Sequence, residues 1–364
     1  MNSKVTGYLL CEDSYVWTKR GLLKVKELLP SDSVLGLDLE KRKVVFEKMR
    51  SKPVKLKSNR SVRITTDVNE LVLPENSEVY TVKGKIRALN ITQGVMVDIF
   101  YRPQIFEFLR KLYKSNPLAS MKIGDRRIII TKNIAYMLGT QAIVPRLTRH
   151  KLVLYLKSGL NYAKVCKILK HALTELKTPH RVYYRPTDYR KIVIYDDSQE
   201  KFLIRMILSL FRNHDVPKVI RISPTIVIQQ FIEGLLDSRA KISKGSLIKL
   251  HIPAPLDRIR RFIYSGLALF DVQPRYTYVN KPNRGLKFFS LYFALPKKRP
   301  FELKSLALSS TSLAIRTRED MKVYSQVKHA VRLRRQQFIV PRIREHWDII
   351  TDLVPLHYQT TELE

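Results

Sequence analysis

Two stretches of this chain predict the same order of helices and strands, at an offset of about 95 residues. The first predicts a helix at 131–143, a strand at 151–157, a helix at 160–177, strands at 181–185 and 189–195, and a helix at 202–211. The second predicts a helix at 226–239, a strand at 247–252, a helix at 256–270, and strands at 275–281 and 287–293. Such an offset is too long for a solenoid and fits a duplicated domain, so we expect a monomer with an internal pseudo-two-fold axis.

The first hundred residues predict a different kind of structure. Between residues 8 and 100, short apolar runs such as Val62–Ile64 alternate with turn-forming Gly, Pro and Asp, which is typical of an all-β fold. A helix is expected at 104–115, with an apolar face formed by Ile105, Phe108, Leu109 and Leu112. We therefore expect a β domain at 1–103, a linker helix at 104–125, two α/β halves at 126–215 and 216–300, and a basic C-terminal segment at 301–364.

The β segment carries a set of spaced residues that resembles the Hint module of inteins. These residues are Cys11, Val16-Trp17-Thr18, Gly21, Val25 to Leu35, and Ile64 to Val68. The resemblance implies protein splicing, which in that family uses a His in the second block and a C-terminal Asn. Val68 stands at the place of the His and the last Asn of the chain is Asn283, so we expect splicing to be lost. Residues 345–354 resemble the strand by which an intein returns to this module after an inserted nuclease.

Residues 231–240, Phe-Ile-Glu-Gly-Leu-Leu-Asp-Ser-Arg-Ala, resemble the dodecapeptide of LAGLIDADG homing endonucleases, and residues 134–139 resemble its first copy. The resemblance implies two packed helices, each ending in a carboxylate that holds a metal ion beside the scissile phosphates. Arg239 takes that place in the second copy, and Val144 or, in another register, Gln141 takes it in the first. No Asp or Glu lies between Asp125 and Glu175, and a guanidinium repels a cation. We expect no metal, no cofactor and no nuclease activity.

These resemblances together predict the fold class. We expect a multi-domain protein, with an all-β Hint-like module and an α/β LAGLIDADG-type domain made of two pseudo-repeated αββαββα halves. The functional positions of the two resembled families that we expect to be degenerate here are Cys11, Val68, Gln141, Val144 and Arg239.

The charge of the chain restricts its partners. There are 67 Lys and Arg against 32 Asp and Glu, a formal net charge of +35. Such a field favours polyanions, that is nucleic acid or an anionic membrane face. No apolar stretch reaches the length of a membrane span and no signal-peptide core follows Met1, so we expect a cytoplasmic protein associated with the nucleoid or the ribosome. The cysteines, Cys11 and Cys166, have no neighbouring ligands at metal spacing, so neither a disulfide nor zinc is expected, and Cys11 fits a small buried thiol.

Strand alternation indicates where nucleic acid would bind. Leu152, Leu154 and Leu156 are expected to face a core, and the residues between them to face outward. In the family that the motifs resemble, such outward faces form a saddle over duplex DNA. The candidate nucleic-acid-binding residues are Lys151, Tyr155, Lys157, Arg181, Arg185, Lys191, Arg239, Lys241, Lys249, Arg275, Lys281, Arg284, Lys287, Arg334 and Arg335. Arg239 has a second interpretation, as a surface side chain favoured by the dipole at a helix C-terminus.

Several functions fit these observations. The leading hypothesis is a non-catalytic protein, derived from an intein-type homing endonuclease, that grips duplex DNA through the basic saddle. A partner made of structured RNA, such as a ribosome, suits the same basic, aromatic surface. A metal-dependent endonuclease using Asp237 or Asp215 is a further alternative. The Hint-like module could also serve as a platform for another protein.

Overall fold

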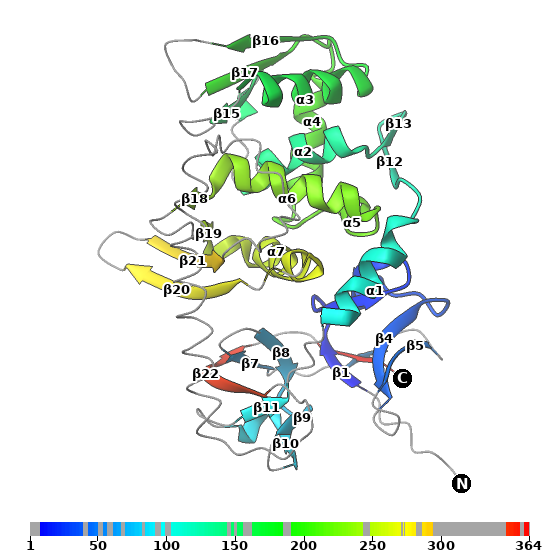
Figure 1. Ribbon diagram of the computed structural model, residues 1–364, viewed down its shortest axis with the longest axis vertical. Coiled ribbons are helices and arrows are strands. Elements are labelled where there is room, and N and C mark those ends of the chain that lie inside the picture. The colour runs from blue at the N-terminus through cyan, green and yellow to red at the C-terminus, as the bar shows by residue number, and fades with distance from the viewer. Residues whose placement is uncertain are drawn as a thin grey trace. The chain divides into compact units, whose positions relative to one another are not determined.

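The structure is a computed structural model that describes residues 8–38, 43–49, 54–56, 61–66, 70–81, 84–91, 96–98, 103–143, 147–148, 151–155, 162–184, 191–242, 248–270, 272, 274–281, 286–293, 347–356 and 360–363. The chain divides into two compact units (Figure 1). One unit contains residues 1–113 and 341–364, and the other contains residues 114–340. Within the described ranges, no helix is both long and apolar enough to cross a bilayer.

The first unit is built from short antiparallel strands, as the sequence predicts. Its N-terminal part contains β1 (Tyr8–Cys11), β2 (Tyr15–Thr18), β3 (Gly21–Lys24), η1 (Val25–Glu27), β4 (Ser33–Asp38), β5 (Lys43–Lys48), β6 (Val54–Leu56), β7 (Ser61–Thr66), β8 (Glu70–Pro74), β9 (Glu78–Thr81), β10 (Gly84–Arg87), η2 (Ala88–Asn90) and β11 (Met96–Asp98). One four-stranded sheet has the order β3-β2-β4-β5.

The end of the chain completes the other sheets of this unit. β22 (Trp347–Leu356) pairs antiparallel with β7, with Leu353 opposite Ile64, and also with β11. β23 (Thr360–Leu363) lies between β1 and β6. The strand expected at 345–354 is therefore present, and the first and last strands of the chain are paired with each other.

Helix α1 (Pro103–Lys114), expected as a linker, packs against the first unit. Its buried side chains are Ile105, Leu109 and Tyr113, and the Tyr113 hydroxyl donates to the carbonyl of Thr18 at 2.5 Å. The prediction that Phe108 belongs to the buried face is wrong, since that side chain is 50% exposed. Residues four apart line up most closely on a helix, so the buried stripe follows 105, 109 and 113.

The second unit contains two sets of elements in the same order. The first is preceded by the hairpin β12 (Ser120–Ile123) and β13 (Arg126–Ile129), and contains α2 (Lys132–Gln141), β14 (Leu147–Thr148), β15 (Lys151–Tyr155), α3 (Tyr162–Glu175), β16 (His180–Tyr184), β17 (Lys191–Asp196) and α4 (Phe202–Phe211). After the short helix α5 (Lys218–Arg221), the second contains α6 (Thr225–Arg239), β18 (Lys241–Ile242), β19 (Ile248–Pro253), η3 (Ala254–Leu256), α7 (Asp257–Leu269), β20 (Arg275–Lys281) and β21 (Leu286–Phe293).

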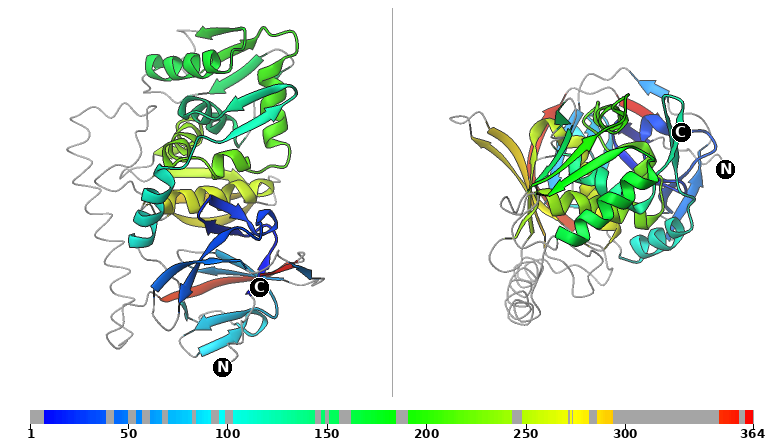
Figure 2. Two further views of the ribbon diagram at one scale, coloured as in Figure 1. Left: turned by 90° about the vertical axis from the view of Figure 1, so that its right-hand side faces the viewer. Right: turned by 90° about the horizontal axis from the view of Figure 1, so that it is seen from above.

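The two halves share one topology. Their sheets have the orders β14-β15-β17-β16 and β18-β19-β21-β20, so each strand of one has a counterpart in the other. Figure 2 shows the whole chain, including these two sheets, from two further directions. The hairpin β12–β13 and the short α5, which the sequence analysis did not predict, lie outside this repeat.

The halves meet where the backbones of α2 and α6 touch. A Cβ atom on Gly139 would lie 2.0 Å from the carbonyl oxygen of Phe231, and one on Gly234 would lie 2.0 Å from that of Tyr136. The contact is reciprocal, because each glycine lies three residues after the carbonyl that the other glycine touches. Only a residue without a side chain permits this approach. The two glycines thus mark the pseudo-two-fold axis.

Replacing Gly139 or Gly234 by Ala should force the two helices apart. Since the obstructing atoms are backbone and cannot rotate away, each change should lower the free energy of unfolding by about 1–3 kcal/mol or more. Urea denaturation followed by circular dichroism measures this loss. Gly36→Ala is the matched control, because its added Cβ would meet Glu47 at an ordinary 3.6 Å. Equal stability of all three variants would contradict the reciprocal contact.

Candidate nucleic-acid interface

The outward face of the first sheet carries a row of polar side chains across three strands. Strand pairing places Lys151 of β15 opposite Tyr195 of β17, and Tyr195 opposite Arg181 of β16. The alternate residues Leu152, Leu154, Ile192 and Ile194 are buried, which confirms the expected inward face for the leucines at 152 and 154. Val153 shares the outward face but is only 9% exposed.

Arg181 is held in place at the edge of this row. Its guanidinium carbon lies 5.5 Å from the centre of the Tyr195 ring, and its side chain is 61% exposed. Two hydrogen bonds of 2.8 and 2.9 Å join it to the carboxylate of Asp197. These hydrogen bonds lower the pKa of Asp197 below its ordinary value. The guanidinium is thus oriented by a ring and a carboxylate while remaining open to solvent.

The second sheet carries the same row. Lys249 of β19 pairs with Tyr292 of β21, and Tyr292 pairs with Arg275 of β20. The Lys249 amine lies 4.9 Å from the centre of the Tyr292 ring, and Arg275 is exposed. Partial burial raises the pKa of Tyr292, but hydrogen bonds with Lys249, Ser290 and Thr277 outweigh that effect and the pKa lies below its ordinary value. Lys241 extends this row on β18, opposite Lys249.

Each sheet therefore presents Lys, Tyr and Arg side by side on corresponding strands. We call Lys151-Tyr195-Arg181 and Lys249-Tyr292-Arg275 the first and second cross-strand rows. The basic members were expected from strand alternation. The two tyrosines were missed, because a side chain joins a row through the register between strands, which alternation within one strand does not specify.

The other candidates lie outside the two rows. Lys287 pairs with Asn280 and has the parity of the buried Phe289 and Leu291, but it is exposed near the strand end. Tyr155 and Lys191 are opposite each other in the ladder, and Lys281 ends β20 opposite Leu286. Lys157, Arg185, Arg284, Arg334, Arg335, Val68 and Val144 lie outside the described residues. Cys11 is the last residue of β1.

The end of α6 combines a cation with a sequestered acid. Arg239 is the last residue of the helix and is half-buried. Asp237 is 1% exposed and accepts a hydrogen bond of 2.7 Å from the Tyr136 hydroxyl. Burial and the nearby Asp237 carboxylate raise the pKa of Tyr136 well above its ordinary value, so the phenol remains a donor. The Asp237 carboxylate thus bridges α6 to α2 inside the protein.

The helix contact decides between the two registers proposed for the first motif. Gly139 and Gly234 are equivalent across the axis, and the same offset makes Val144 the counterpart of Arg239. Gln141 is instead the counterpart of Leu236, and its side chain is buried beside Thr140, to which it donates a hydrogen bond of 3.1 Å. Asp215 is half-buried and accepts from the backbone of Val216 at 2.8 Å. Nowhere in the described ranges do three acidic, His or Cys side chains gather as a metal site.

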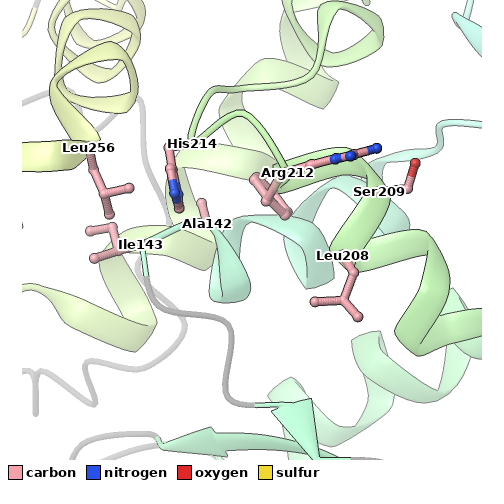
Figure 3. A pocket seen from close by; sticks show the side chains of 8 residues that line it. Ala142, Ile143, Leu208, Ser209, Arg212, His214 and Leu256 are labelled. Carbon is pink, nitrogen blue, oxygen red and sulfur yellow. The ribbon is translucent and has the colours of Figure 1, made fainter.

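A cavity of about 460 Å³ lies beyond the end of α2 (Figure 3). It is lined mainly by apolar side chains, including Ile143, Leu208 and Leu256, with Arg212 and His214 at its polar part. None of the residues that line this cavity in the described structure is acidic.

Comparisons with known proteins find similarity only in parts of the chain. No described protein family and no curated protein matches the sequence. The homing endonuclease I-DmoI, solved in complex with DNA and Mn, is similar over 45% of this chain and 90% of its own, with 11% sequence identity and a TM-score of 0.34. The same protein in complex with DNA and Ca is similar over 46% of this chain and 84% of its own, with 12% sequence identity and a TM-score of 0.35. The DnaX mini intein from Spirulina platensis is similar over 33% of this chain and 73% of its own, with 18% identity and a TM-score of 0.22.

Proposed function

We propose that this protein binds duplex DNA through the outward faces of its two four-stranded sheets and does not cleave it. The observation that carries the proposal is the recurrence of the cross-strand row. Lys and Arg contact phosphates, and each row supplies one of each beside a tyrosine. The net charge of +35 supplies the long-range attraction.

The spacing within a row suits a duplex. Neighbouring strands lie about 4.8 Å apart, so the Lys and Arg that flank the central tyrosine are about 10 Å apart at the backbone. The major groove is about 12 Å wide, so flexible side chains at this spacing can reach phosphates on both of its sides. The tyrosine between them restrains the cations, as the ring contacts of Arg181 and Lys249 show. Restrained cations lose less conformational entropy on binding.

The chemistry at the end of α6 supports the proposal of binding without cleavage. Metal-assisted hydrolysis of a phosphodiester needs free carboxylates to hold the ion. Here the last side chain of the helix is Arg239, and the buried Asp237 carboxylate accepts a hydrogen bond from the Tyr136 hydroxyl. A guanidinium binds phosphate directly through its planar donors. We therefore propose a phosphate clamp at this position.

Structured RNA is the second candidate, favoured by the exposure of Tyr183. This side chain lies on the outward face of β16, two residues from Arg181, and is 49% exposed. An exposed tyrosine beside cations could stack on an unpaired base. Competition between duplex DNA, duplex RNA and ribosomal particles at one salt concentration separates the candidates, and we expect duplex DNA to compete best.

Removing the basic members of the second row should reduce the salt dependence of binding. For Lys249→Gln with Arg275→Gln, we expect the slope of log K against log salt to become shallower by about 1.8, since each phosphate contact contributes about 0.9. Fluorescence anisotropy with a labelled duplex measures the slope. The control is Lys85→Gln with Lys111→Gln, which removes the same charge from lysines paired with Glu78 and Glu107. An equal change in the control would show that only net charge matters.

Asp197→Asn should strengthen binding by about two- to fivefold, the range expected when one exposed ion pair is removed. The carboxylate holds Arg181 in the free protein and repels phosphate, so its loss makes the guanidinium available. Asp125→Asn makes the same charge change in the turn between β12 and β13. Titration of one duplex with each variant measures the two changes in affinity. An equal gain for Asp125→Asn would show that the effect comes from net charge and not from the release of Arg181.

No cleavage is expected when the protein is incubated with plasmid DNA in the presence of Mg²⁺ or Mn²⁺. Agarose electrophoresis would detect nicked or linear product. Asp237→Asn is the informative variant, because a product that the wild type forms and this variant does not would assign a metal-dependent nuclease to Asp237 and overturn binding without cleavage.

A further inference from the structure

The outer side of α3 carries a second set of exposed cations. Lys167, Lys170 and Lys177 are exposed, and we call these three lysines the α3 stripe. Their spacings of three and seven residues place them along one side of the helix and its end. Val165, Leu169 and Leu173 are fully buried on the opposite side. The stripe therefore faces solvent along the length of the helix.

The acids near this helix do not neutralise the stripe. Glu175, the acidic residue of α3, accepts hydrogen bonds from the side chains of Asn133, at 2.7 Å, and Thr131. Across the described ranges, no carboxylate forms an ion pair with Lys167, Lys170 or Lys177. Lys177 also has a φ of 50°, a left-handed backbone that favours Gly or Asn. A lysine is thus present where local conformation favours another residue.

The corresponding helix of the second half uses its cations differently. In α7, Arg260 and Arg261 pair with Asp257 at 2.7 and 3.0 Å. Arg260 is 1% exposed, and its guanidinium carbon lies 4.6 Å from the centres of the Tyr276 and Phe289 rings. Because the two helices occupy equivalent places in one topology, the fold itself does not require exposed cations on α3.

The stripe and the outward face of the first sheet point away from each other. The sheet buries its inward face, at Leu152, Ile192 and Ile194, so the helices of the same half must cover that face. The buried side of α3, at Val165, Leu169 and Leu173, faces this interior, so its exposed side lies across the half from the outward face of the sheet. One duplex would have to bend sharply to touch both, and duplex DNA is stiff over about 150 base pairs.

We propose that the α3 stripe binds the phosphate backbone of a second duplex DNA segment, so that one protein molecule holds two duplexes. This inference rests on the proposed function of the sheets. From Lys167 to Lys177 the stripe extends about 15 Å along the helix, a length over which one strand of a duplex presents about four phosphates. Protein interfaces have apolar or aromatic residues at their centres. The exposed residues described on α3 are polar or charged, which favours a phosphate backbone over a protein partner.

The test is the number of duplexes bound per protein molecule. Mass photometry at a fixed low salt concentration, with 40-base-pair duplexes in excess, should give one protein with two duplexes for the wild type. Lys167→Gln with Lys170→Gln and Lys177→Asn should give one duplex, because Gln keeps the helix and Asn tolerates the left-handed backbone. Capture of a second, differently labelled duplex on a surface that carries the first should fall at least tenfold.

The control variant removes three lysines whose charges are already matched. Lys26→Gln, Lys85→Gln and Lys111→Gln change the net charge equally, and the three lysines pair with Asp13, Glu78 and Glu107. This variant should still bind two duplexes. A wild type that binds one duplex overturns the inference and leaves the proposed function intact. Loss of all duplex binding in the α3 variant also overturns it, since the stripe would then belong to the first site. A wild type that binds no duplex contradicts the proposed function itself.

Discussion

The arrangement of the second unit depends on direct contact between the backbones of α2 and α6. Gly139 and Gly234 each leave room for a carbonyl oxygen of the other helix, and no other residue type would fit at 2.0 Å. This contact sets the distance and the rotation between the halves, and so it sets where the two sheets lie. The surface that we propose to bind DNA is a consequence of this interface, although neither glycine approaches it.

Two acids of this unit are buried and accept hydrogen bonds in its interior. Asp237 is bonded to Tyr136 within the helix pair, and Glu233, which is 0% exposed, accepts from Gln229 and Gln230 at 3.0 and 2.7 Å. Buried carboxylates with donors stabilise the interface, while an unsatisfied one would be costly. The cations of the two rows and of α3 are at the surface instead. These two buried carboxylates therefore do not offset the cations of the rows and of α3.

The duplication provides an internal comparison. Where the two sheets agree, in the rows Lys151-Tyr195-Arg181 and Lys249-Tyr292-Arg275, the agreement identifies side chains that are present beyond what either sheet needs to fold. Where the halves differ, as in the exposed lysines of α3 and the paired arginines of α7, the difference identifies a surface specific to one half. The agreement supports a DNA-binding surface shared by both sheets, and the difference supports an additional DNA-binding surface on α3.

The sequence alone determined the order of the longer helices and strands in the two halves, because apolar periodicity, turn residues and the 226–239 motif are local properties. It did not predict the hairpin β12–β13 or α5. The expectation that Arg239 stands where the resembled motif has an acid also comes from the sequence alone. Only the tertiary structure decided which strands are neighbours, and with them that Tyr195 and Tyr292 complete the rows and that Lys287 has the opposite parity. It also decided the equivalence of Gly139 and Gly234 across the axis, and the exposure of Phe108. These features depend on register and packing between segments far apart in the chain, which local patterns do not specify.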